Sequence, residues 1–504
     1  MRVLVVGGGS AGWIAAATLQ SRLNGTGPGR VAITLVESPD TPRIGVGEAT
    51  IPTIRDMLRG FGMAEADVMR ACEASFKHAI RFDDWSAPGS RYLHPFHRHR
   101  SPDMQTAAAR WLEGDGALPF DAFASAQPAL ITAGLAPRAL DGADYQGPVP
   151  YAYHMDAEMF ADALAAHCVA RGVRHLRDHV DRVDRDAGGL VTGLALRSGQ
   201  RIEADLYIDC TGFRALLSPQ AHQPGGWVDQ SRHLLCDRAV AFRVPEDPER
   251  FVPLPFTRAR ALGSGWCWDI GLMTRRGRGY VYSSAHISAD DAEAELRAEE
   301  GAAASGLTAR HLRFRVGRQV APWTGNVVAI GLAAGFLEPL ESTGLYLADY
   351  AARVLCEMFP PTPAHVANPA LARRHNQLLA EVHDDILDFI LLHFAVAGRR
   401  DTAFWRDASA PQRLTDRLAH LLDIWNVRPP RFSDFSLRYP PFNDLNYEFI
   451  LLGSGWRPAG LGRGRGRPDL PPDAAAANRA IAAGLPTNAA LLARIHGRPG
   501  ATRP

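Results

Sequence analysis

Four consecutive residues, Glu341, Ser342, Thr343 and Gly344, combine the groups that an anion-binding catalytic site needs. They follow a strand-like run and a glycine turn, and they precede an apolar helical run at 345–358. Unpaired backbone N–H groups and the helix dipole at such a helix start favour an anion. Glu341 adds a carboxylate at the ligand crevice of an α/β sheet, so the segment predicts part of an active site. A capped helix with a structural glutamate is the simpler alternative.

Lys77 is the only lysine in the 504 residues, and the other basic side chains are all arginines. A primary amine can lose its proton and act as a nucleophile, whereas a guanidinium cannot in practice. The pattern of apolar residues at 71–85 predicts a strand, which would place Lys77 on a semi-buried element. This position makes Lys77 a catalytic candidate, with chance retention on the surface as the alternative.

Residues 3–36 predict a strand, a glycine turn, a helix over 13–23 and a second strand. The glycines of a GxGxxG turn allow a tight turn, close approach to a pyrophosphate and close helix–strand packing, and an acid after the second strand accepts from ribose hydroxyls. Dinucleotide binding is therefore predicted. The residues that carry it are Gly7, Gly9, Ser10, Ala11, Gly12, Trp13 and Glu37.

A second glycine-rich turn, within 41–58, leads into a helix with Pro52 near its first turn. Its N-terminus could meet a second phosphate or an isoalloxazine edge, and an ordinary capped helix is the alternative. Further along, Trp266 and Trp268 are two residues apart in a predicted strand, so both rings should lie on one sheet face. Plain core packing would explain that pair equally well.

The composition argues against several classes of protein. A net charge of +1 gives no strong field for nucleic acid or a membrane surface. The six cysteines are scattered without a CxxC pair, which indicates reduced thiols and neither a metal site nor a disulfide framework. The first residues form a strand-like run and no apolar run is long enough to span a bilayer, so a cytoplasmic location is expected.

The strand that ends at Asp209, followed by Gly212, resembles the second flavin-contacting turn of FAD enzymes. The expected fold is therefore α/β, with a Rossmann-like FAD-binding domain built on mixed sheets and a mostly helical region that covers the substrate. The proline-rich stretch at 359–367 suggests a boundary, giving a box-like domain at 1–358 and a helical capping region at 359–504. Excursions toward the substrate site are expected near 86–155 and 218–253, and helices over 368–397 and 411–426. The Gly/Arg/Pro/Ala-rich tail from about 457 is expected to be loosely ordered.

Taken together, these motifs resemble the flavin-dependent tryptophan halogenase family from residue 1 to about 456. The combination of the Gly12-Trp13 pair, the lone Lys77 and the segment before Gly344 is much more specific than GxGxxG alone. The matching segments are 7–13, 45–52, 76–77 with Trp85, 94–96, 153–157, 208–214, 266–270, 336–344, 388–393 and 400–405.

The resemblance implies that reduced FAD and O₂ oxidise chloride or bromide to hypohalous acid, which Lys77 directs onto an indole- or phenol-type ring. Glu341 then stabilises the cationic ring and takes its proton. The halide is held at Ser342, Thr343 and Gly344. The resemblance also implies cofactor contacts at Ala49, Thr50, Val180, Gly331 and Leu332, and substrate contacts at His94, Phe96, Trp266 and Trp268. The implied partners are a separate flavin reductase and a free or tethered aromatic substrate, with neither nucleic acid nor membrane, and a homodimer stays open.

Two departures from the family pattern concern the substrate. Gly271 stands where the family's WxWxIP motif has proline, and the residues that grip the amino-acid part of free tryptophan have no clear match in 441–456. An aromatic substrate other than free tryptophan is therefore favoured. The competing readings are a single-component FAD-dependent aromatic hydroxylase, which would typically carry Gly-Asp where this chain has Gly331-Leu332, and a flavoprotein that binds without turnover.

Overall fold

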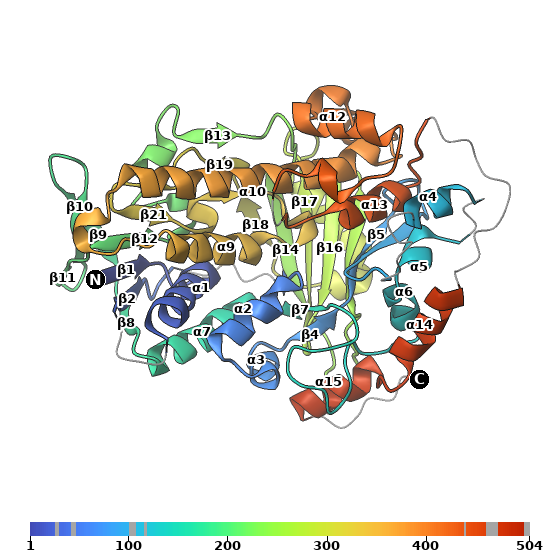
Figure 1. The fold of residues 1–504 in the computed structure, drawn as a ribbon, viewed down its shortest axis with the longest axis horizontal. Coiled ribbons are helices and arrows are strands. Elements are labelled where there is room, and N and C mark those ends of the chain that lie inside the picture. The colour runs from blue at the N-terminus through green and yellow to red at the C-terminus, as the bar shows by residue number, and fades with distance from the viewer. Residues whose placement is uncertain are drawn as a thin grey trace.

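The structure, a computed structural model, describes residues 1–25, 30–41, 47–99, 107–114, 118–437, 440–459 and 472–497. Within these residues, two large sheets lie side by side and helices cover them (Figure 1). The predicted α/β class with mixed sheets is confirmed. The second glycine-rich turn lies partly outside the described residues, and residues 460–471 of the predicted tail lie wholly outside them.

A six-stranded sheet forms the N-terminal half, with strand order β20-β21-β12-β1-β2-β8. Its neighbours run parallel except for the pair β20–β21. The predicted strand–turn–helix–strand unit is present, and its helix packs against α7 and α9. The elements are β1 (Arg2–Val6), α1 (Ser10–Leu19), β2 (Ala32–Glu37), α7 (Ala157–Ala170), β8 (Arg174–Arg177), β12 (Leu206–Asp209), β20 (Trp323–Thr324), β21 (Val327–Ala329) and α9 (Gly344–Glu357).

A seven-stranded sheet forms the other half, in the order β18-β14-β17-β16-β15-β5-β6, with only the β15–β5 pair parallel. The sheet positions the second half of the site because it holds the strand that directly follows Lys77. Its strands are β5 (Ala79–Asp83), β6 (Arg91–Pro95), β14 (Arg238–Pro245), β15 (Phe256–Leu262), β16 (Gly265–Gly271), β17 (Arg275–Tyr282) and β18 (Arg310–Arg313).

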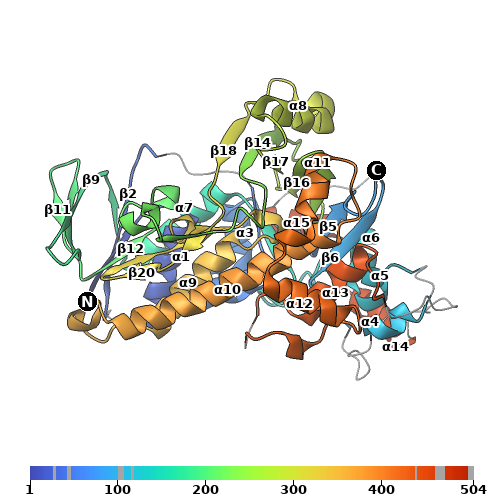
Figure 2. The same ribbon diagram turned by 90° about the horizontal axis from the view of Figure 1, so that it is seen from above.

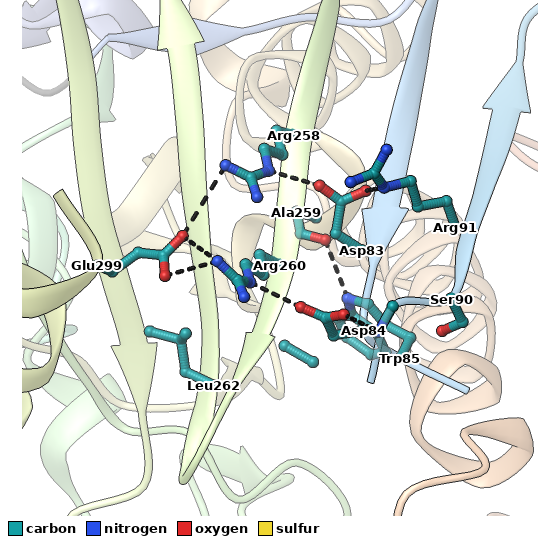
Figure 3. Close-up of polar contacts among 12 residues, drawn as sticks. Asp83, Asp84, Trp85, Ser90, Arg91, Arg258, Ala259, Arg260, Leu262 and Glu299 are labelled. Atoms are coloured by element: carbon teal, nitrogen blue, oxygen red, sulfur yellow. Dashed lines mark hydrogen bonds and ion pairs between the residues drawn. The ribbon is translucent and has the colours of Figure 1, made fainter. Parts of the chain in front are cut away.

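An ion-pair network fixes β5 against β15 and against α8 (Ala289–Glu300), as Figure 3 shows. Arg258 donates a hydrogen bond to the buried Asp83. Arg260 donates to Asp84 at 2.7 Å and to Glu299 at 2.6 Å, and so links the two carboxylates. Asp83 and Asp84 lie at the end of β5, so the network holds the far end of that strand in register. The strand is thereby a rigid support for the residues that precede it.

Three small sheets complete the β structure in the described residues. The sheet β3-β7-β4 carries Lys77 and pairs it with Ala152. The predicted strand around Lys77 is therefore confirmed as β4, followed at once by β5. The remaining strands are β3 (Glu48–Ala49), β4 (Ser75–Lys77), β7 (Ala152–Met155), β9 (Val180–Arg185), β10 (Val191–Leu196), β11 (Arg201–Ile202), β13 (Trp227–Asp229), β19 (Gly317–Gln319) and β22 (Gly335–Phe336).

The long helix α10 (Pro369–Val396) runs from the six-stranded sheet to the C-terminal helices (Figure 2). It confirms the helix expected over 368–397, and α12 occupies the second part of the segment expected over 411–426. The other helices are α2 (Thr53–Phe61), α3 (Glu65–Ala71), α4 (Ala107–Leu112), α5 (Phe120–Ala124), α6 (Gln127–Thr132), α11 (Ala403–Ala408), α12 (Asp416–Trp425), α13 (Asp444–Gly453), α14 (Pro472–Ala482) and α15 (Asn488–His496).

The expectation of a loosely ordered tail from 457 is wrong for its last described part. Helix α15 packs against α3, and its Leu491, Leu492 and Ile495 side chains are buried. The Arg70 guanidinium of α3 donates to the Ile495 carbonyl oxygen at 3.0 Å. Among the described residues, none of the helices combines the length and the apolar character that crossing a membrane requires.

Candidate functional site

A cavity of about 1020 Å³ extends from the first glycine turn to the N-terminus of α9. Its wall contains most of the residues predicted to hold the cofactor and the halide. These are Gly7, Gly9, Ser10, Ala11, Glu37, Ala49, Val180, Gly331, Leu332, Ser342, Thr343 and Gly344. Gly12, Trp13 and Thr50 stand outside this wall. The sequence therefore predicted most of one continuous cavity from segments that are far apart in the chain.

Two glycines of the first turn, Gly7 and Gly12, are required for steric reasons, and Gly9 faces open space. Gly7 has a φ of +116°, and a Cβ there would be 2.2 Å from the Cys210 carbonyl oxygen. A Cβ at Gly12 would be 1.9 Å from the Gly7 carbonyl oxygen, so Gly12 brings α1 close to β1. A Cβ at Gly9 would meet no atom within 4 Å, because Gly9 borders the open cavity. The turn thus leaves its backbone exposed to a ligand.

Two other predicted cofactor residues lie behind this wall. Trp13 is fully buried, and its ring packs edge-on against His175 with centroids 4.9 Å apart. His175 in turn lies 3.0 Å from the Glu37 carboxylate, so Trp13 supports the acid that ends β2. The Thr50 hydroxyl donates to the Tyr153 carbonyl oxygen, and the Thr50 carbonyl faces Lys77. Thr50 therefore contributes to the lysine site through its backbone.

Lys77 is completely buried at the end of β4. Its Nζ donates to the Thr50 carbonyl oxygen at 3.0 Å and to Ser342 Oγ at 2.9 Å. An ammonium has three donors, so one N–H has no acceptor in the described part of the chain. Nζ lies 5.4 Å from the centre of the Phe96 ring. Burial lowers the pKa of Lys77 to about 7, although the Glu341 carboxylate opposes this shift. The amine can thus donate a hydrogen bond or act as a base near neutral pH.

Glu341 is also buried, and two imidazoles hold its carboxylate. His94 Nδ1 lies 3.0 Å from both carboxylate oxygens, and His393 Nε2 lies 2.8 Å from Oε1. Burial favours the neutral acid, but the imidazoles of His94 and His393 prevail and lower the pKa of Glu341 to about 2. Within the part of the chain that the structure describes, Lys77 and Glu341 form no direct ion pair. Ser342, the next residue after Glu341, makes the contact to the amine.

The N-terminus of α9 is open to the cavity. Ser342 has a φ of 60°, in the left-handed region, and this bend turns the chain into the helix that begins at Gly344. No described residue accepts a hydrogen bond from the backbone N–H of Thr343 or Gly344. Both residues line the cavity, so two free donors and the helix dipole are available to an anion there.

The four residues predicted to contact the substrate fall into two groups. His94 and Phe96 lie with Lys77 and Glu341, and the His94 ring packs near Phe389, Phe442 and Phe449. Trp266 and Trp268 instead line the large cavity, with their ring centres 6.3 Å apart. The structure therefore does not gather the four residues around one space.

Ser342 joins the two compartments, because it lines the large cavity and also accepts the hydrogen bond from Lys77. The sequence reasoning assigned no role to two polar neighbours of the glutamate site, His393 on α10 and Asn446 on α13. Asn446 Nδ2 lies 2.9 Å from His94 Nε2. His393 ends the segment 388–393 that resembles the family, but the contacts of both residues become visible only in the packing of the C-terminal helices.

Comparisons with known proteins agree with this geometry. The sequence matches the tryptophan halogenase family over residues 2–465. Tryptophan 6-halogenase SttH from Streptomyces toxytricini is 37% identical over 476 residues, which cover 90% of this chain and 89% of that protein. Tryptophan 7-halogenase RebH from Lentzea aerocolonigenes is 37% identical over 488 residues, covering 91% and 90%.

The fold is shared as well as the sequence. The crystal structure of a tryptophan halogenase from Shewanella frigidimarina NCIMB 400 matches with a TM-score of 0.90 at 33% identity, covering 99% of this chain and 98% of that chain. A family match over most of the chain, close relatives of nearly equal length and a common fold show that this chain belongs to the flavin-dependent tryptophan halogenase family.

Proposed function

We propose that this chain halogenates an electron-rich aromatic ring of the indole or phenol class, using chloride or bromide, O₂ and reduced FAD from a separate reductase. The observation that carries the proposal is the buried Lys77 amine, which bonds Ser342 at the wall of the large cavity and has one N–H without an acceptor among the described residues. A location in the cytoplasm, with the reductase and its reduced nucleotide, fits this activity.

The cavity fits the cofactor that the family uses. Its volume of about 1020 Å³ suits a dinucleotide, and the open backbone at Gly9 and the carboxylate of Glu37 match a pyrophosphate and a ribose. Bound FAD in its reduced form would supply the activation of O₂ that turns halide into hypohalous acid. The free N–H groups of Thr343 and Gly344 would hold the halide at the end of the same cavity.

On the other side of Ser342, the protein's own residues direct the oxidant. Lys77 holds hypohalous acid through its remaining N–H, or carries the halogen after losing its own proton, and either way places the halogen beside the ring. Phe96 and His94 flank the ring and fix which carbon faces the amine. The Glu341 carboxylate stabilises the cationic ring and accepts its proton. Position, and not intrinsic ring reactivity, would then select the product.

The substrate favoured by these contacts is an aromatic compound other than free tryptophan. A free amino acid brings an ammonium and a carboxylate, which need charged or polar partners beside the ring. On α13, Asn446 is bonded to His94, and the buried Glu448 lies 3.5 Å from Arg98. Burial raises the pKa of Glu448 to about 8 although Arg98 opposes this shift, so near neutral pH neither Glu448 nor Asn446 offers a negative charge to an ammonium. This supports an indole, a phenol or a larger tethered aromatic as the substrate.

The test is a mass-shift assay with the purified protein, a flavin reductase with NADH, FAD, bromide and a panel of indoles and phenols. The expected product carries one bromine in place of hydrogen. Lys77→Arg and Lys77→Met should still bind FAD and consume O₂ but give no brominated product, because neither side chain offers a transferable amine proton. Normal bromination by Lys77→Arg would remove Lys77 from the mechanism. Reduction of bound FAD by NADPH without the reductase, followed by hydroxylation, would instead support the hydroxylase reading.

A Glu341→Gln variant tests the proton acceptor in the same assay. Glutamine keeps the size of the side chain but cannot take a proton from the ring. Product formation should fall by roughly 10²–10⁴-fold, the usual contribution of a general base, while O₂ consumption stays near the wild-type rate. An unchanged bromination rate would exclude Glu341 as the base.

A further inference from the structure

The His393 imidazole lies between the Phe389 carbonyl and the Glu341 carboxyl group. When Glu341 is ionised, both of these groups can accept hydrogen bonds but neither can donate one. His393 Nδ1 is 2.7 Å from the Phe389 carbonyl oxygen, one turn back on α10, and its Nε2 is 2.8 Å from Glu341 Oε1. The ring is completely buried and is enclosed by the aromatic rings of Phe82, Trp85 and Phe389. This packing fixes the orientation of the His393 ring, so its two nitrogens keep these two hydrogen-bond partners.

A count of protons follows from this geometry. A neutral imidazole has one N–H, and the Phe389 carbonyl requires that N–H at Nδ1. The short contact between Nε2 and Oε1 then needs a second proton, which either completes an imidazolium or makes Glu341 a neutral acid. The His393–Glu341 pair thus holds one proton more than a neutral histidine beside a carboxylate would.

His94 does not need such a proton. The Asn446 amide is oriented by its own Oδ1, which accepts from the Asn443 backbone N–H at 2.9 Å, so Nδ2 faces His94 Nε2 and donates to it. His94 then carries its single proton on Nδ1 and shares it between both oxygens of Glu341. A neutral His94 satisfies all of these contacts. The additional proton therefore lies in the His393–Glu341 contact and not on His94.

A second buried glutamate shows what the carboxylate would do without this partner. Glu338 is as buried as Glu341, and its donors are two neutral groups, the Trp266 indole N–H at 2.7 Å and the Cys236 thiol. Burial raises the pKa of Glu338 to about 7 although Trp266 and Cys236 favour the ionised form. The pKa of Glu341 is about 2. Two neutral donors therefore do not keep a glutamate ionised in this core, whereas positive charge at the neighbouring imidazoles, together with their hydrogen bonds, does.

We propose that His393 is held as an imidazolium and is the positioning residue that keeps Glu341 ionised in its dry surroundings. The inference rests on the proposed function, because it assigns Glu341 the role of accepting the ring proton. In that step the ring C–H bond breaks, its electron pair returns to the ring, and the proton goes to a Glu341 oxygen. His393 keeps both of its protons throughout, and Glu341 passes its new proton to water when the product leaves.

The first experiment reads the proton itself and needs no turnover. The substrate-free protein is labelled with ¹⁵N-histidine, and the His393 ring signals are identified by their loss in His393→Gln. Both ring nitrogens of His393 should show the signature of protonated nitrogen at pH 8, whereas His94 should show one protonated and one bare nitrogen. A singly protonated His393 ring would overturn the proposal. This result is independent of whether any aromatic compound is halogenated.

The second experiment measures the pH dependence of bromination by His393→Gln and by the wild type. In the variant, Glu341 keeps two neutral donors, the glutamine amide and His94 Nδ1–H, as Glu338 has Trp266 and Cys236, so the carboxyl should become protonated near neutral pH. The ratio of kcat values, variant to wild type, should fall about tenfold per pH unit below the new pKa and recover at higher pH. The Lys77 amine and the Tyr92 phenol also face Glu341 and contribute to the pH dependence of both proteins. The kcat ratio of variant to wild type at each pH removes this shared contribution, which the profile of the variant alone would contain.

The matched control is His383→Gln, which replaces another buried histidine of α10 that lies away from Glu341. Its kcat ratio should not change with pH. A flat ratio for His393→Gln, with the protein folded and active, would show that His393 has no part in the ionisation of Glu341. Failure of the wild type to halogenate any aromatic would instead contradict the proposed function and leave the ¹⁵N result standing.

Discussion

At the scale of single residues, the chemistry depends on groups that are unfavourable to bury. Lys77 is fully buried, and burial lowers its pKa to about 7. Between this value and the unfolded value near 10.5, the unfolded chain binds a proton that the folded protein does not bind. Stability therefore rises with pH over this window, and the cost of burying the charged amine is fully present below about pH 7.

A Lys77→Met variant should reveal this cost. Methionine has a similar length and no charge, so the stability of the variant relative to the wild type should be highest near pH 7. The difference should then move in favour of the wild type by roughly 1.4 kcal/mol per pH unit as the pH rises toward 10. Denaturant unfolding at pH 7 and pH 9 would measure it. The same difference at both values would mean that the folded and unfolded states hold the Lys77 proton equally.

The sequence indicated the reactive side chains but not how they meet. Lys77 stood out because it is the only lysine, and Glu341 and Ser342 because they precede a predicted helix. The direct contact is between Lys77 and Ser342, not between Lys77 and Glu341. His393, although it ends the segment 388–393 that resembles the family, and Asn446 were assigned no role, because their contacts cross from the C-terminal helices to distant strands and turns.

At the scale of elements, the free start of α9 is the part that should bind halide. A Cβ at Gly344 would meet no atom within 4 Å, so a Gly344→Ala variant should fold normally and place its methyl group in the cavity. The bromide concentration at half-maximal rate should rise severalfold because the methyl group crowds the amide site. Gly60→Ala in α2 is the matched control, since its Cβ also meets no atom but lies away from the cavity. An unchanged bromide dependence in Gly344→Ala would place the halide elsewhere.

Helix α15 shows where sequence patterns fail at this scale. Its surroundings are rich in Ala, Gly and Pro, which is typical of a poorly ordered tail. Its stability comes instead from distant partners, because Ala136 pairs with Pro486 and Asn488 bonds the Pro253 carbonyl. The one local signal was Thr487, whose hydroxyl caps the helix.

The docking of α15 can be tested by truncating one of its buried side chains. Leu492→Ala should lower the free energy of unfolding by about 2–5 kcal/mol, because a buried leucine is replaced and a cavity remains. Arg494→Ala on the same helix removes only an exposed ion pair with Asp141 and should change stability by less than about 1 kcal/mol. Equal effects of the two substitutions would mean that the helix does not pack as described.

At the scale of the whole molecule, the site has two halves, and both sheets contribute to the first. The parallel strands with their glycine turns and strand β16 of the seven-stranded sheet line the large cavity, and β6, α10 and α13 surround the Lys77 and Glu341 region. The first half followed from the sequence because nucleotide-binding turns have a local signature. The second half followed only in part, since single residues were named but β4, β6, α10 and α13, which bring them together, are distant in the chain.

This division predicts that cofactor binding can be weakened without unfolding either half. Reduced or oxidised FAD should raise the melting temperature of the wild type, because a ligand at 100 times its Kd stabilises the folded state by about 2.7 kcal/mol. Gly9→Ala places a methyl group in the open cavity where the pyrophosphate should approach, so the FAD-induced increase should shrink. Without FAD, the variant should melt close to the wild type, as should the control Gly60→Ala, which keeps the full FAD response. An undiminished response in Gly9→Ala would place the pyrophosphate away from the first turn, and the Rossmann assignment of that turn would then have to be abandoned.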